Sequence, residues 1–121
     1  ELTKGVLRCR EVDLKTLVFA GDLEELKKVL ELTPTFAAYE PPELVGNTET
    51  SVAQAEPEII AKASVLAKEA GIPLIVGAGI NSRDDVRKSL ELGAVGVAVA
   101  TDVVKAEDPR KEILDLTEGF G

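Results

Sequence analysis

The chain has 121 residues, which corresponds to a single domain over residues 1–121. Its composition, 45% hydrophobic and 30% charged, is typical of a packed soluble domain. Histidine is absent and Cys9 is the single cysteine, so histidine-dependent triads, histidine-ligated metals and intramolecular disulfides are excluded. The net charge of −8 and the 3% aromatic content argue against a nucleic-acid-binding face.

Targeting signals are also missing from the sequence. No apolar run approaches the ~18 residues that a membrane-spanning helix needs, and no secretory leader opens the chain. We therefore expect a cytoplasmic protein without a membrane partner. Methionine is absent and the first residue is Glu1, which predicts that the sequence is part of a longer polypeptide.

Apolar runs alternate with helical patterns from residue 16 onward, after a helical pattern over residues 2–12. Residues 16–20 predict a first strand, and Asp22 with Glu25 three positions later resembles a capping box. A helix is therefore expected over residues 22–32. Its apolar face would hold Leu23, Leu26, Val29 and Leu30.

The second unit has a strand over residues 35–39 and then a polar loop over residues 41–55. This loop is much longer than the ~2–6 residues common between a strand and a helix, so it is the place to look for function. Pro57 begins the next helix and Gly71 ends it. The expected buried stripe is Ile59, Ile60, Ala63, Leu66, Ala67 and Ala70.

Two further units complete the pattern. Residues 72–77 predict a third strand, and Ser82 with Asp85 caps a helix that ends before Gly93. Residues 94–100 predict a fourth strand, and Asp108 with Pro109 begins a last helix that carries Ile113, Leu114 and Leu116. The acidic residues at helix starts are interpreted as N-terminal charges on solvated faces: Glu24, Glu25, Asp84 and Asp85.

Strands without polar alternation are covered on both faces, and their alternation with helices predicts right-handed crossovers. The fold class is therefore α/β, with about four parallel strands alternating with helices. Periodicity alone fits both a doubly wound sheet and a segment of a (β/α)8 barrel.

The loops favour the barrel. Residues 36–46 read FAAYEPPELVG, which closely resembles the sixth strand and flexible loop of triosephosphate isomerases, in particular the archaeal form with its EPPELIG sequence. Residues 75–109, IVGAGINSRDDVRKSLELGAVGVAVATDVVKAEDP, are similar to the seventh and eighth βα units of that family. The resemblance runs in order over roughly residues 10–118. It implies the C-terminal half of a TIM barrel, and half of the ~250 residues of a whole barrel is about this length.

The resemblance implies an isomerase that interconverts dihydroxyacetone phosphate and glyceraldehyde 3-phosphate, with no cofactor and no metal. Glu40 would be the base that moves a proton between two carbons through an enediolate, once residues 41–46 close as a lid and exclude water. Backbone N–H groups of Gly46, Gly79, Ala100 and Thr101 would bind the substrate phosphate.

Two positions depart from the family pattern, since Thr48 and Asp102 stand where archaeal members carry glycine. A negative charge at Asp102 would oppose phosphate binding if it faced the ligand. The family also uses a lysine after the first strand and a histidine after the fourth, which belong to the half of the barrel not represented here.

The expected partner is consequently an N-terminal half-barrel or a second copy of the chain, in an oligomer that covers the bare sheet edges. The alternative from another class is a non-catalytic half-barrel that only binds phosphate or assembles. A phosphate-binding barrel with a different reaction is a further alternative.

Overall fold

The computed structural model describes all residues, 1–121, and its helices alternate with strands. The main elements are α1 (Leu2–Glu11), β1 (Leu17–Ala20), α2 (Leu23–Glu31), β2 (Phe36–Tyr39), α4 (Pro57–Ala70), β3 (Leu74–Val76), α5 (Arg83–Glu91), β4 (Gly96–Val97) and α7 (Pro109–Thr117). The short elements are η1 (Pro42–Leu44), α3 (Val52–Ala55), α6 (Thr101–Val104) and η2 (Glu118–Phe120). None of the helices combines the length and the apolar character required to span a bilayer.

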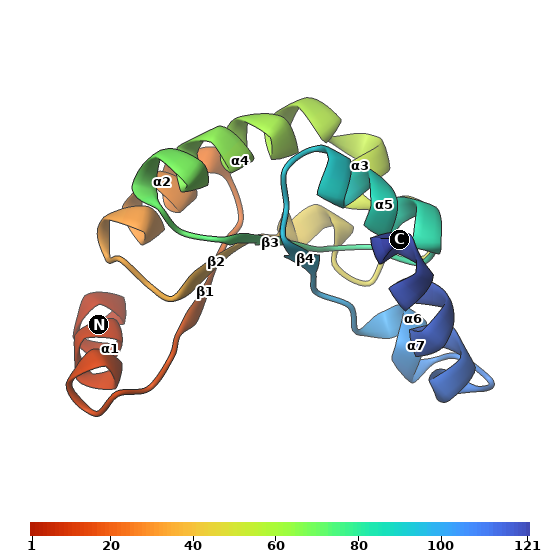
Figure 1. Cartoon of the computed structure of the whole chain (residues 1–121), viewed down its shortest axis with the longest axis horizontal. Helices are drawn as coiled ribbons and strands as arrows, with labels where there is room; N and C mark the ends of the chain where they lie inside the picture. The colour runs from red at the N-terminus through yellow and green to blue at the C-terminus, as the bar shows by residue number, and fades with distance from the viewer.

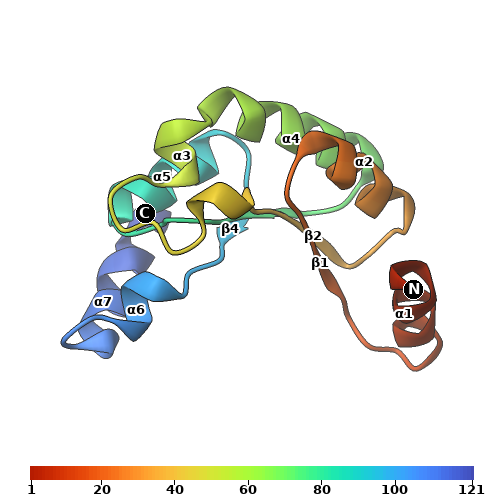
Figure 2. The same ribbon diagram turned by 180° about the vertical axis from the view of Figure 1, so that it is seen from behind.

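The four strands are all parallel and lie in the order β1-β2-β3-β4. Each strand therefore pairs with the next strand of the chain, as in a (β/α)8 barrel, whereas a doubly wound sheet reverses its order at a switch point. Figures 1 and 2 show α2, α4 and α5 arching over one face of the sheet, with no helix over the other face between α1 and α7. The fold is an open α/β sheet, consistent with half of a TIM barrel.

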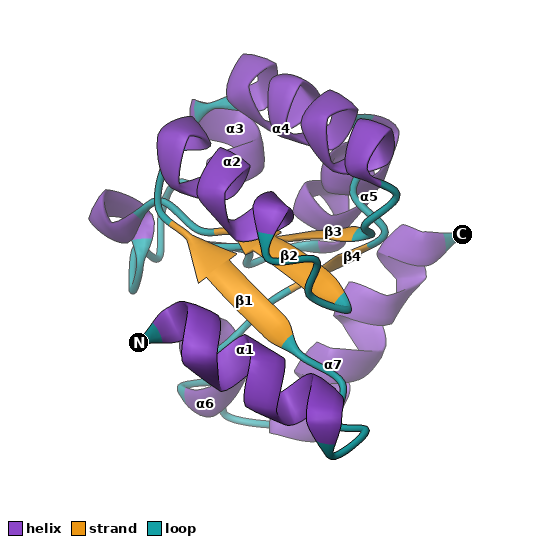
Figure 3. Ribbon diagram, turned by 90° about the vertical axis from the view of Figure 1, so that its left-hand side faces the viewer, coloured by secondary structure: helices purple, strands orange, loops and turns teal.

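The hydrophobic core lies between the sheet and the helices on its covered face. In Figure 3 these helices lie above the strands, whereas only α1, α6 and α7 lie below them. Alternate strand residues and one face of each helix are buried there. The largest contributors are Val18, Tyr39, Leu74 and Val76 from the strands and Leu26, Val29, Leu30, Ile60 and Val86 from the helices.

The opposite face of the sheet is apolar and is not covered by the chain itself. Strand register places Phe19, Ala38, Ile75 and Gly96 in one row across it. Large and small residues alternate in this row, and a Cβ on Gly96 would lie 3.1 Å from Ile75 Cδ1. Such rows form the layers inside a barrel. Phe19 is 47% exposed, so the layer is incomplete in this chain.

The helix starts agree with the sequence patterns. Asp22 Oδ1 accepts a hydrogen bond from the Glu25 N–H (2.8 Å), and Ser82 Oγ accepts one from the Asp85 N–H (3.1 Å). One detail differs from the expected capping box: the Glu25 carboxylate accepts from the N–H of Gly21 (2.7 Å) instead of that of Asp22. Each cap satisfies amide groups that the helix cannot pair internally.

Three other expectations are wrong in part. The fourth strand, expected over residues 94–100, is limited to Gly96–Val97, because its single partner β3 ends at Val76. The loop over residues 41–55 contains η1 and α3, and α3 forms because Ser51 and Gln54 make a capping box. Ala70 is exposed, because the buried stripe of α4 ends before the chain turns at Gly71 (φ 71°).

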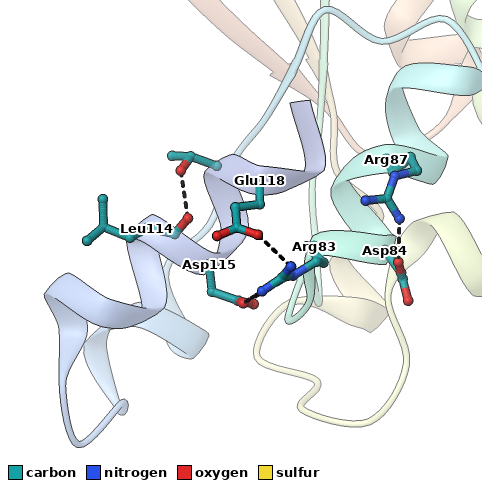
Figure 4. Close-up of polar contacts among 7 residues, drawn as sticks. Arg83, Asp84, Arg87, Leu114, Asp115 and Glu118 are labelled. Atoms are coloured by element: carbon teal, nitrogen blue, oxygen red, sulfur yellow. Dashed lines mark hydrogen bonds and ion pairs between the residues drawn. The ribbon is translucent and has the colours of Figure 1, made fainter. Parts of the chain in front are cut away.

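The C-terminal segment is attached to α5 by an arginine. Arg83 donates from Nε to Asp115 on α7 (3.1 Å) and from Nη1 to Glu118 on η2 (2.5 Å), as Figure 4 shows. Because α6 lies between β4 and α7 in the chain, this attachment also limits where α6 can lie at the end of the sheet.

Candidate functional site

The parallel ladder continues beyond the last residues of β2, β3 and β4. The N–H groups of Glu40, Gly77 and Ala98 donate to the carbonyl oxygens of Ala20, Tyr39 and Val76, at 2.9, 3.1 and 2.8 Å. These three residues therefore stand in one row at the carboxyl edge of the sheet, on the uncovered face. Glu40 is the single member of the row with a side chain longer than a methyl group, so its carboxylate projects over small neighbours.

A cavity of about 280 Å³ opens at this edge. Its lining includes all five residues named from the sequence: Glu40, Gly46, Gly79, Ala100 and Thr101. They come from the end of β2, the loop after β2, the loop after β3 and the start of α6. Thus the structure brings the proposed base and the proposed phosphate-binding residues to one place, the carboxyl end of parallel strands, where barrel enzymes hold their active sites.

The four residues expected to bind phosphate share a property of their backbone. The N–H groups of Gly46, Gly79, Ala100 and Thr101 donate to no other protein group. Free amide donors around a cavity attract an anion, and small side chains let it approach the main chain. No lysine or arginine lines the cavity, so in this chain any anion depends on these amides for binding.

Residues 41–51, which we call the lid segment, form one wall of the cavity. Gly46 adopts the left-handed region (φ 79°), and Asn47 Oδ1 then accepts from the N–H groups of Glu49 and Thr50, both at 2.8 Å. Thr48, which departs from the family pattern, receives a hydrogen bond on its carbonyl oxygen from Asn81 Nδ2 (3.0 Å). The lid segment therefore contacts the loop after β3 through main-chain atoms.

Asp102, the second departure, also lines the cavity, and its Oδ2 atom is buried without a hydrogen-bond partner. Burial, together with the nearby carboxylates of Glu112, Asp115 and Asp85, raises the pKa of Asp102 to about 6. The fraction of molecules in which Asp102 is negatively charged therefore falls as the pH falls toward that value.

Tyr39, the residue before Glu40, is held on the covered side of the sheet. Its hydroxyl donates to Glu56 Oε1 (2.7 Å), at the junction of α3 and α4. Burial, and then the hydrogen bond and negative charge of Glu56, raise the pKa of Tyr39 above its ordinary value, so the hydroxyl stays protonated as a donor.

One of the four acidic residues that we expected to be solvated at helix starts is instead buried. Glu24, Glu25 and Asp84 are exposed as expected, but Asp85 is only 2% exposed. Its carboxylate accepts hydrogen bonds from Ser51 Oγ (2.7 Å) and from the N–H of Asn81 (3.1 Å). The Ser82–Asp85 spacing indicates the helix start, but nothing local indicates a partner 34 residues earlier.

Comparison with known proteins places these features in a family context. A family model described as thiazole biosynthesis protein ThiG matches residues 50–116. The triosephosphate isomerase of Thermoplasma volcanium is 48% identical over 96% of the chain, and that of Methanopyrus kandleri is 42% identical over 97%. The ThiG match begins at residue 50, after Glu40 and most of the lid segment, whereas the two isomerase matches cover at least 96% of the chain and so include both. The chain spans about half the length of these relatives, 54% and 53% respectively.

Solved structures support the fold alone. A thiamine phosphate pyrophosphorylase from Pyrococcus furiosus aligns with a TM-score of 0.70 at 23% identity, over 93% of this chain and 52% of that one. Mandelate oxidase with (S)-4-hydroxymandelic acid aligns with a TM-score of 0.70 at 18% identity, over 98% and 36%.

Proposed function

Because the chain belongs to the triosephosphate isomerase family, and corresponds to the C-terminal half of its archaeal members, we propose that it contributes half of an isomerase active site. The reaction is the interconversion of dihydroxyacetone phosphate and glyceraldehyde 3-phosphate. The observation that carries this proposal is the shared cavity, which is lined both by Glu40 and by the four residues whose backbone N–H groups are unpaired.

Glu40 acts as the base in this proposal. It removes a proton from the carbon beside the substrate carbonyl, which leaves an enediolate, and it returns a proton to the neighbouring carbon. A carboxylate at the end of a strand is held by the sheet, so the distance to a bound substrate is set by rigid structure. Closure of residues 41–46, the first part of the lid segment, excludes water and protects the enediolate during the transfer.

The backbone amides hold the phosphate and so orient the triose toward Glu40. Gly46 brings its N–H from the lid segment, Gly79 from the loop after β3, and Ala100 with Thr101 from the start of α6. Because one of these amides lies on the lid segment, binding of the phosphate dianion by all three segments would favour the closed position of the lid.

The remaining catalytic groups come from another half-barrel. This chain has no histidine and brings no cation into the cavity, whereas an enediolate needs a partner for its developing negative charge. We propose that an N-terminal half-barrel supplies a lysine and a histidine and covers the apolar face that contains Phe19 and Ile75. A second copy of this chain would cover the same face without supplying a histidine.

The test uses a completed barrel, meaning this chain combined with the N-terminal half of an archaeal relative such as that of Methanopyrus kandleri. Glu40→Gln should lower kcat on the order of 100- to 10,000-fold, because an amide cannot accept the proton. Affinity for phosphoglycolate, measured by calorimetry, should stay unchanged. Glu43→Gln, which removes an exposed carboxylate from the lid segment, is the matched control.

A Glu40→Gln variant within about tenfold of the parent kcat would remove Glu40 from the role of base. If the completed barrel binds phosphoglycolate but isomerises no triose phosphate, the non-catalytic phosphate-binding function is correct instead.

A further inference from the structure

Asp85 is a buried carboxylate without a cation. It lies in the first turn of α5, is 2% exposed, and makes no ion pair, unlike its neighbour Asp84, which pairs with Arg87 (2.7 Å) on the surface (Figure 4). Burial of an unpaired charge is unfavourable unless hydrogen bonds replace the lost water. In Asp85, both carboxylate oxygens have donors: Ser51 Oγ bonds to Oδ1 and the N–H of Asn81 bonds to Oδ2.

The two donors belong to two segments that form different walls of the cavity. Ser51 is the last residue of the lid segment, and Asn81 is the last residue of the GAGIN loop, by which we mean residues 77–81. Asp85 itself does not line the cavity, whereas Asn81 does. The Asp85 carboxylate therefore joins two segments that line the cavity, although Asp85 itself does not line it.

Further contacts run along the same junction. The N–H of Val52 donates to the carbonyl oxygen of Ala78 (2.9 Å), and a Cβ on Gly79 would stand 3.1 Å from the Cα of Ser51. The end of the lid segment thus packs directly on the residue whose N–H is proposed to bind phosphate. A small movement of Ser51 would change the position of Gly79.

We propose that Asp85 is a positioning residue, whose carboxylate ties Ser51 to Asn81 and thereby fixes the end of the lid segment against the GAGIN loop. The inference rests on the proposed function, since its consequence is the binding of a phosphate monoester by Gly46 and Gly79. The tie gives the lid segment a fixed end, so that its opening and closing is confined to the residues before Ser51. It also holds Ser51 at a fixed position relative to Gly79, so that the Gly46 amide returns to the same place beside Gly79 whenever the lid segment closes, as binding of one dianion by both amides requires.

The first readout needs no ligand and no activity. In the completed barrel, Asp85→Asn should speed hydrogen exchange of the Val52 and Asn81 amides about tenfold, because an amide side chain cannot accept on both sides. Asp84→Asn is the matched control, since it removes the same charge from the same helical turn without touching the lid segment. If Asp85→Asn is folded and its exchange at both amides equals that of Asp84→Asn, the tie is absent and the proposal is wrong.

The second readout connects the tie to the site. Asp85→Asn should weaken phosphoglycolate binding about tenfold and raise KM more than it lowers kcat, because it loosens the phosphate site and leaves Glu40 in place. Ser51→Ala should also weaken phosphoglycolate binding. In the double variant, the fold-loss of affinity should not exceed the product of the two single fold-losses, because both substitutions remove the same Ser51–Asp85 hydrogen bond. Faster exchange with unchanged phosphoglycolate affinity would overturn the positioning role. If the unsubstituted barrel itself fails to bind phosphoglycolate, the proposed function fails, and the exchange result alone decides whether the tie exists.

Discussion

The carboxylate of Glu40 lies over the backbone of Gly77: a Cβ on Gly77 would stand 2.8 Å from Glu40 Oε2 and 3.2 Å from the carbonyl oxygen of Ala98. Both distances are shorter than ordinary van der Waals contact, so a methyl group at position 77 would force the Glu40 carboxylate to move and the Ala98 carbonyl to shift by a few tenths of an ångström. Glycine at this position therefore leaves the space that the Glu40 carboxylate occupies.

Gly77→Ala should therefore displace the Glu40 carboxylate. In the completed barrel we expect kcat to fall about 100-fold, the size of effect produced by a misplacement of roughly 1 Å. The control is Gly96→Ala, where a Cβ would meet the flexible end of Ile75 at 3.1 Å. Steady-state assays measure kcat for the two variants. Equal kcat values for Gly77→Ala and Gly96→Ala would contradict the close approach of Glu40 to Gly77.

Tyr39→Phe should lower the free energy of unfolding by about 1–2 kcal/mol, since it removes the hydrogen bond to Glu56 and leaves that half-buried carboxylate without this donor. Urea denaturation of the completed barrel measures the change. Replacement of Glu56 by glutamine, which can still accept the bond, should cost less. Equal stability of Tyr39→Phe and the parent would show that the bond contributes nothing.

The helices and the strand positions could be predicted from the sequence because they depend on local patterns. Asp22, Ser82 and Asp108 cap their helices through residues three positions later, and apolar spacing identifies the buried faces. The strand order could not be predicted from periodicity. It followed from the resemblance of the loops, which places Glu40 at the end of the second strand.

Features that depend on distant residues could not be predicted locally. The burial of Asp85 requires Ser51, which lies in a loop that no periodic pattern describes. The short β4 reflects the length of its neighbour β3 and the absence of a strand on its other side. The left-handed φ of Gly46 and the free N–H groups at the cavity are properties of the assembled loops.

Asp102 should make stability depend on pH in a predictable direction. Its pKa is about 6 when folded, above the value of 3.8 without the structural environment, so the folded state retains the proton more strongly. The stability that this provides is fully present below pH 3.8 and is lost as the pH rises through about 6. The difference in unfolding free energy between the parent and Asp102→Asn should therefore fall over this interval and then level off. A difference that rises with pH would contradict this environment for Asp102.

The uncovered apolar face predicts self-association of the chain alone. Leu17 and Phe19 are 45% and 47% exposed, and β1 and β4 both have a free edge. Sedimentation equilibrium across a hundredfold dilution should show a dimer or larger species, and addition of an N-terminal half-barrel should replace it with a heteromeric complex. Leu17→Lys should weaken self-association. A cooperatively folded monomer at micromolar concentration would contradict the proposed role of this face.

We propose that Glu40 moves a proton on the substrate. Proton NMR of dihydroxyacetone phosphate in D2O tests it most directly, because an enediolate that receives its proton back from a base in exchange with solvent acquires deuterium at carbon. The completed barrel should exchange the carbon-bound proton for deuterium, and Glu40→Gln should do so on the order of 100- to 10,000-fold more slowly while it still binds phosphoglycolate. Deuterium incorporation at the parent rate in Glu40→Gln would contradict the assignment of Glu40 as the base.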